Sequence, residues 1–213
     1  MIRLRIISTI IILTSLIACD EPMATFSEPQ PIEVDNLTKL PKRLQGQYLN
    51  LTDNSKLIVY DQQILRIYDF DVKGHRNQLD SNTRISGDSL IDLETKEKSL
   101  VKFDGDSVII HQHQIDTLFH FDNDNVIRKF KGYYFMSTRR YKEKWEVQKI
   151  QLSKGQLVIS SISTKLDIDN LKSITETTQD TISPYKFQLT KKQFNEFIEN
   201  DGFRDSKTFV KQK

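Results

Sequence analysis

The stretch that decides the fold reads Trp145-Glu146-Val147-Gln148-Lys149-Ile150-Gln151-Leu152, followed by Ser153-Lys154-Gly155 and Leu157-Val158-Ile159. Apolar and polar residues alternate from Trp145, which predicts a strand with one buried and one solvated face. The segment 153–155 is typical of a turn, and a second apolar run follows it. The stretch therefore predicts an antiparallel hairpin.

Two earlier stretches repeat this pattern of apolar run, turn and apolar run. Residues 57–60 and 64–68 flank Asp61-Gln62-Gln63, and residues 100–103 and 108–110 flank Asp104-Gly105-Asp106. Asp-Gly supplies the positive φ that a tight hairpin turn needs. Three hairpins predict a mainly β fold, which is an antiparallel meander, a barrel-like sheet or two related small β units.

One short capped helix is predicted near the C-terminus. Thr190-Lys191-Lys192-Gln193 is a capping box, in which the Thr hydroxyl and the Gln side chain each bond a backbone N–H. Phe194, Phe197 and Ile198 then fall on one helix face, and Gly202 stands where a left-handed C-terminal cap belongs. A shorter helix over 169–174 and a final strand from Phe203 through 209–210 complete the expected fold.

An internal repeat bears on the domain organisation. Lys42-Arg43-Leu44-Gln45-Gly46-Gln47-Tyr48 aligns with Arg128-Lys129-Phe130-Lys131-Gly132-Tyr133-Tyr134 at an offset of 86 residues. Each copy is expected to open a strand, with the glycine allowing a close approach of the backbone and the tyrosine closing the core. The repeat predicts a first β unit over 42–127 and a second over 128–213, and a single domain over 42–213 is the alternative.

The N-terminus reads as a secretory signal. Arg3 and Arg5 precede an apolar run over 6–16, and Leu16-Ile17-Ala18-Cys19 ends it with small residues and the one cysteine of the chain. A membrane span needs about 20 apolar residues, so this run is too short for a retained helix. We expect cleavage after residue 18.

This motif resembles the lipobox of bacterial lipoproteins. Asp20-Glu21 after it resembles the surface-export signals of some Bacteroidetes-type lipoproteins, and in overall style the chain resembles their uncharacterised envelope lipoproteins. The lipobox resemblance covers residues 1–19 and implies that the Cys19 sulfur carries a diacylglycerol and that its amine takes a palmitate-type acyl chain. It implies a protein held on a membrane of the cell envelope, the outer rather than the inner one, with the leaflet left open. The prolines over 19–41 then predict an extended lipidated tether.

A second resemblance concerns the glycine-aromatic pairs of the repeat. Gly46-x-Tyr48 and Gly132-x-Tyr134 are similar to the opening of lipocalin-type β modules, although Tyr stands where those usually have Trp. This resemblance brings no binding residues with it.

A metal site is the one candidate for special chemistry. His111 and His113 lie two residues apart on a predicted strand, so they share a face and could begin a zinc or copper site. His120, Asp116 or Asp122 could supply the third ligand. A solvated sheet face is the commoner explanation for such a pair, so we expect no cofactor besides the lipid on Cys19.

Charge and motifs restrict the remaining function classes. Of the 31 Lys and Arg residues two lie in the signal, so 29 remain against 29 Asp and Glu, and this balance predicts no nucleic-acid partner. The chain has no nucleophile elbow and no glycine-rich phosphate loop. We expect a non-catalytic binding or structural module for an envelope protein or a small apolar ligand, and an envelope hydrolase that uses dispersed carboxylates is the alternative.

Overall fold

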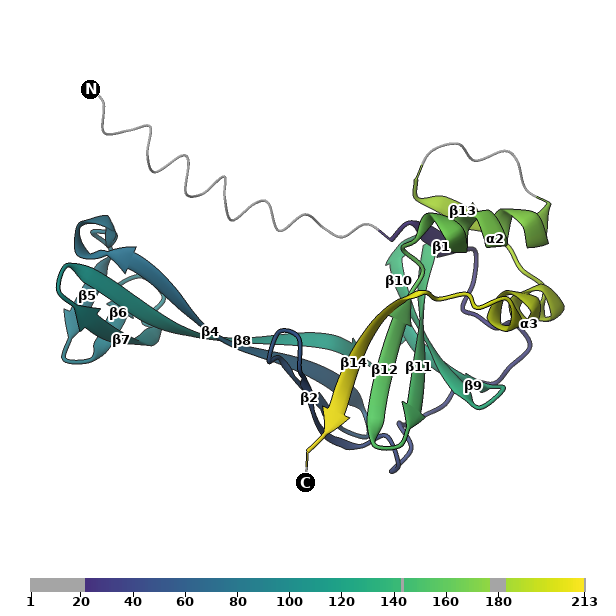
Figure 1. Ribbon diagram of the computed structural model, residues 1–213, viewed down its shortest axis with the longest axis horizontal. Helices are drawn as coiled ribbons and strands as arrows, with labels where there is room; N and C mark the ends of the chain where they lie inside the picture. Colours follow the sequence, from purple (N-terminus) through teal and green to yellow (C-terminus); the bar gives the residue numbers. More distant parts are fainter. Residues whose placement is uncertain (1–21, 143, 177–182, 213) are drawn as a thin grey trace. The chain divides into compact units, whose positions relative to one another are not determined.

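The computed structural model describes residues 22–142, 144–176 and 183–212. Within them, the fold is mainly β: fourteen strands form one open, mostly antiparallel sheet, and two short α-helices lie near the C-terminus (Figure 1). The strand order has two ends, β13 and β5, so the sheet is not closed into the barrel-like alternative. The strands are β1 (Ala24–Phe26), β2 (Gly46–Asn50), β3 (Lys56–Val59), β4 (Gln63–His75), β5 (Thr83–Ser86), β6 (Ser89–Asp92), β7 (Lys98–Asp104), β8 (Ser107–His120), β9 (Asn125–Phe130), β10 (Tyr133–Tyr141), β11 (Lys144–Ser153), β12 (Gln156–Ser161), β13 (Tyr185–Phe187) and β14 (Asp205–Lys211), and the helices are α2 (Lys165–Thr175) and α3 (Lys191–Glu199).

All three predicted hairpins are present. They are β3–β4, β7–β8 and β11–β12, each with its turn where the sequence places it. Strands β4 and β8 run far beyond the apolar segments that predict them, because they pair with each other over nearly their whole length. The outer half of β4 is mostly exposed to solvent, whereas the outer half of β8 includes the buried side chain of Val108.

The chain divides into two compact units, neither of which is continuous in sequence. Among the described residues, unit 1 comprises 22–36, 124–142, 144–150, 159–176 and 183–206, and unit 2 comprises 37–123, 151–158 and 207–212.

Unit 1 has an aromatic core between its strands and its two helices. Phe135 from β10 lies 4.9 Å from Phe194 of α3 and 5.8 Å from Phe203, measured between ring centroids. Trp145 and Val147 alternate onto the same face of β11, as predicted. The helices therefore cover one face of β1, β10 and β11 (Figure 1).

Both helices begin with a capping box. Thr190 Oγ1 accepts from the Gln193 N–H at 3.2 Å, and Gln193 Oε1 accepts from the Thr190 N–H at 2.9 Å, which confirms the predicted start of α3. Thr164 and Asp167 form the same reciprocal pair at the start of α2. Phe194 and Phe197 are fully buried on the predicted face.

The predicted glycine cap of α3 is wrong in its conformation. Asp201 and Phe203 take the left-handed conformation, with φ of 55° and 66°, whereas Gly202 between them does not. Gly202 is required by space, because a Cβ there would lie 2.5 Å from Cζ of Phe197. Residue 202 must therefore be glycine because the Phe197 ring occupies the space of a side chain, and the sequence pattern does not reveal this contact.

The proline-containing segment is folded from residue 22 onward. Strand β1 is completely buried and pairs with β11 and β13. Arg128 holds the segment that follows β1 in place, since its Nη1 donates hydrogen bonds to the carbonyl oxygens of Pro29 and Pro31 at 2.6 and 2.8 Å. This part of 19–41 is therefore not the extended tether that its prolines predict. Prolines exclude regular ladder pairing, but they do not exclude anchoring through carbonyl groups.

The two copies of the internal repeat adopt different local structures. Gly46 is the first residue of β2, with φ of 139°, whereas Lys131 and Gly132 form the turn between β9 and β10. The tyrosines that follow, Tyr48 and Tyr134, are both buried. Tyr48 donates its hydroxyl hydrogen to Leu44 O at 2.8 Å, and burial raises its pKa.

Unit 2 continues the meander. Its strands are hydrogen-bonded in the order β14-β2-β3-β4-β8-β7-β6-β5 (Figure 1). The buried guanidinium of Arg66 stabilises the base of β4, donating to Ser55 Oγ at 3.1 Å and to Asp53 Oδ2 at 2.7 Å. The ring of Tyr68 covers the same guanidinium at 4.7 Å.

Candidate functional site

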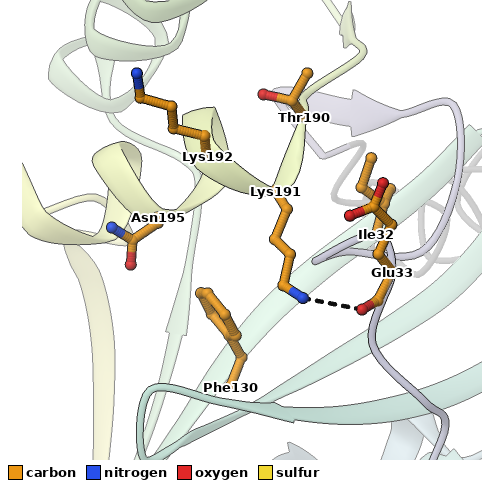
Figure 2. A pocket seen from close by; sticks show the side chains of 7 residues that line it. All are labelled: Ile32, Glu33, Phe130, Thr190, Lys191, Lys192 and Asn195. Atoms are coloured by element: carbon orange, nitrogen blue, oxygen red, sulfur yellow. Dashed lines mark hydrogen bonds between the residues drawn. The ribbon is translucent and has the colours of Figure 1, made fainter.

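A pocket of about 510 Å³ lies at the start of α3 in unit 1 (Figure 2). Its lining combines three segments that are far apart in the sequence, and carbon atoms form most of the lining surface although five of the seven residues are polar or charged. The end of β9 and the start of α3 pack on the unit 1 core, and the hydrogen bond from Lys191 to Glu33 joins the segment after β1 to them. The lining residues are Ile32, Glu33, Phe130, Thr190, Lys191, Lys192 and Asn195.

Lys191 is the cation that faces this pocket. Its Nζ donates to the backbone oxygen of Glu33 at 3.0 Å and lies 6.0 Å from the centre of the Phe130 ring. Figure 2 shows the side chain of Lys192, the next residue, directed away from Phe130. An ammonium has three donors, and the Glu33 carbonyl takes one of them. The pocket therefore combines an aromatic wall with unused donor capacity.

Asn195 contributes a polar atom that lacks a partner. Its Nδ2 donates to Glu199 Oε1 at 2.7 Å, while its Oδ1 is buried without a hydrogen bond among the described residues. The capping box at Thr190 fixes where α3 begins. Lys191 and Asn195 are four residues apart in this helix, so they lie one turn apart on the same side. An unsatisfied buried acceptor is costly to the folded state.

The structure places the predicted histidine pair on the exposed half of the β4–β8 ribbon. His113 Nδ1 lies 2.7 Å from Asp69 Oδ1, and His111 Nδ1 lies 3.0 Å from Asp71 Oδ1. Each aspartate is the direct cross-strand neighbour of its histidine. The hydrogen bond from His113, followed by that from Lys56, lowers the pKa of Asp69.

The predicted third ligands do not join this pair. Asp116 lies opposite Arg66 in the β4–β8 ladder and accepts a hydrogen bond from Gln114. His120 lies at the far end of β8, where its Nε2 is 2.6 Å from Asp122 Oδ2. In the part of the chain that the structure describes, no three His, Cys, Asp or Glu side chains form a group that could hold a metal. The strand register carries the other candidates away from His111 and His113.

A smaller pocket of about 360 Å³ adjoins His111 in unit 2. It contains two carboxylates, those of Asp71 and Asp88, together with Leu100 and Lys102. Both aspartates are exposed to solvent.

The remaining predicted site residue, Cys19, lies outside the described residues. Sequence reasoning missed the α3 pocket altogether. One local signal for it is the pair Lys191-Lys192 inside the capping box. Positive side chains are unfavourable in the first turn of a helix, so their presence there suggests a role other than helix stability.

Comparisons with protein-family models, curated proteins and solved structures give no match for this chain. Among the helices that the structure describes, none has the length and apolar character needed to cross a membrane.

Proposed function

We propose that this chain is a lipid-anchored protein of the bacterial cell envelope that binds a small amphipathic ligand without transforming it. The observation that carries the proposal is the α3 pocket, in which an apolar lining and the Lys191 ammonium occur together. Its volume falls within the range of about 300–1,000 Å³ that small-molecule sites occupy.

The lining suggests the ligand's chemistry. Ile32 and the ring of Phe130 would contact an apolar portion, and burial of apolar area would provide most of the affinity. A carboxylate or phosphate on the ligand would accept from Lys191 Nζ, since charge-assisted hydrogen bonds are the stronger ones.

Octanoate is a suitable probe, because it combines a short apolar chain with one carboxylate. We expect it to perturb the NMR signals of Phe130 and of the first turn of α3 in the full chain carrying Cys19→Ser. Lys191→Met keeps the apolar stem but removes the charge, so binding should weaken about tenfold, as expected for a charged hydrogen bond of roughly 1.5 kcal/mol.

Lys192→Met is the matched control, because Lys192 also borders the pocket but its side chain is directed away from Phe130 (Figure 2). It should bind octanoate like the parent chain, and octylammonium should bind to neither. Equal octanoate affinity in the two variants, or perturbations that avoid Phe130, would refute the ligand proposal.

The anchor is supported by Leu16-Ile17-Ala18-Cys19 and is tested separately. Cells fed an alkyne-bearing palmitate should incorporate the label into the parent chain and not into Cys19→Ser. The variant should also leave the membrane fraction, because two or more acyl chains are needed for stable attachment. Label retained by Cys19→Ser would disprove lipidation at this residue.

A second role, binding of a protein partner, is supported by apolar side chains that remain exposed in unit 2. Phe70, Val72 and Ile85 are each more than two-fifths exposed. Phe70 and Val72 share one face of β4 through their spacing of two residues. Phe70→Ser with Val72→Ser should lose a partner that the parent chain retains in a pull-down from native membranes, and an unchanged set of bound proteins would count against this role.

A further inference from the structure

Two histidine rings in unit 2 are held by carboxylates in a way that leaves a metal-binding nitrogen open on each. An ionised carboxylate can only accept, so Asp71 and Asp69 require a hydrogen on the Nδ1 atoms of His111 and His113. In a neutral imidazole the other nitrogen, Nε2, then carries the lone pair. Neither Nε2 atom has a hydrogen-bond partner among the described residues.

The strand brings the two imidazole side chains to the same face. His111 and His113 are two residues apart in β8, so their side chains project from one face with a spacing of about 7 Å along the strand. The side chains are 45% and 54% exposed, so an ion in solution can reach both. Asp69 and Asp71 lie behind them on β4 with the same spacing.

This arrangement is the one that proteins use around metal ligands. A ligating histidine commonly donates its second ring N–H to a carboxylate, which fixes the ring's orientation and makes the ligating nitrogen more basic. In this chain both members of the pair have that support, whereas His120 contacts Asp122 through its Nε2 and lies at the end of β8, seven residues beyond His113.

We propose that His111 and His113 form a two-histidine site for a borderline divalent transition-metal ion such as Zn²⁺, with water in the remaining coordination positions. Imidazole nitrogen suits Zn²⁺, Cu²⁺ and Ni²⁺, and excludes Mg²⁺ and Ca²⁺, which prefer oxygen. The site needs no third protein ligand and is independent of the α3 pocket, so the two proposals fail or succeed separately.

Zinc titration by calorimetry tests the site in the full chain carrying Cys19→Ser, which removes the one thiol that could also bind zinc. We expect saturable binding of one Zn²⁺ per chain and no heat from Mg²⁺. His111→Ala and His113→Ala should each weaken binding at least tenfold, because a single imidazole cannot chelate. Asp69→Asn combined with Asp71→Asn should weaken it by about tenfold through loss of the supporting carboxylates.

His120→Ala is the matched control, since it removes a histidine from the same strand and should leave zinc affinity unchanged. Circular dichroism of each variant checks that the sheet is intact. NMR of the ring nitrogens gives a second readout: before zinc is added, both rings should carry hydrogen on Nδ1, and zinc should shift the Nε2 signals. Absence of saturable binding, or an affinity that His111→Ala and His113→Ala leave intact, overturns the proposal.

Discussion

The amide of Gly202 donates to the carbonyl oxygen of Phe197 at 2.9 Å, while the ring of Phe197 folds back over the same glycine. An added Cβ at residue 202 would lie 2.5 Å from the ring and 2.6 Å from that carbonyl oxygen. The ring is fully buried and lies 5.2 Å from the ring of Phe203. One residue without a side chain thus allows α3 to end and its last phenylalanine to enter the unit 1 core.

Gly202→Ala should therefore destabilise the protein, because a buried ring and a backbone carbonyl would both have to move. Overpacking of this kind costs about 1–3 kcal/mol of unfolding free energy, which urea denaturation can measure. Gly74→Ala is the control, since a Cβ there meets its nearest atom at 3.7 Å, an ordinary contact. An equal loss in the two variants would contradict the crowding argument.

Removal of the Asp167 carboxylate should destabilise the pairing of α2 with the segment that follows α3. This fully buried side chain accepts from Thr164 Oγ1 at 2.7 Å and from the N–H and guanidinium of Arg204 at 3.3 Å. Asp167→Ala leaves these donors unsatisfied, so we expect a loss of about 2–4 kcal/mol in unfolding free energy. Asp169→Ala, in the same helix but exposed, should change stability little, and similar losses for both would show that burial is not the cause.

Arg128→Ala should release the segment between β1 and residue 36. Besides the two proline carbonyls, Arg128 bonds Asn36 Oδ1 through its Nε at 2.8 Å. We expect limited proteolysis to cut this segment in the variant but not in the parent chain. Lys129→Ala, at the exposed neighbouring position, is the control. Resistance of Arg128→Ala to proteolysis would mean that β1 pairing alone holds the segment.

Acid should weaken unit 2 partly through Asp53. Burial raises the pKa of this carboxyl group, but hydrogen bonds from the side chain and amide of Ser55, together with the charge of Arg66, lower it more. A lowered pKa stabilises the folded state above the ordinary carboxyl value near 4, and this stabilisation is lost as the pH falls through the folded pKa. Asp53→Asn should be less stable at pH 6 and should decline less between pH 5 and pH 2.5.

Melting temperatures across this pH range provide the measurement. Asp61→Asn, which changes an exposed carboxylate in the β3–β4 turn, should retain the parent's acid dependence. Parallel curves for the parent and Asp53→Asn would show that Asp53 does not contribute to acid unfolding.

Local patterns predicted local structure well in this chain. Hairpin turns such as Asp104-Gly105 and the Thr190 capping box involve residues within a few positions of one another, so the sequence pattern alone predicts them. The same reasoning failed for the segment after residue 22, where the decisive partner, Arg128, is about a hundred residues away. It also failed at Gly202, where contact with a neighbouring ring decides the residue and no left-handed φ is involved.

By itself the sequence determined the β class, the three hairpins, the helix start at Thr190 and the presence of two histidines on one strand face, because each depends on periodicity or on neighbours along the chain. Only the tertiary structure decided that Lys191 faces Phe130 and Glu33, and that Asp69 and Asp71 stand behind His113 and His111. Those relationships depend on strand register and on the packing of distant segments. Hydrogen bonds across the β4–β8 ladder and burial of the unit 1 core establish them, and neither leaves a local pattern.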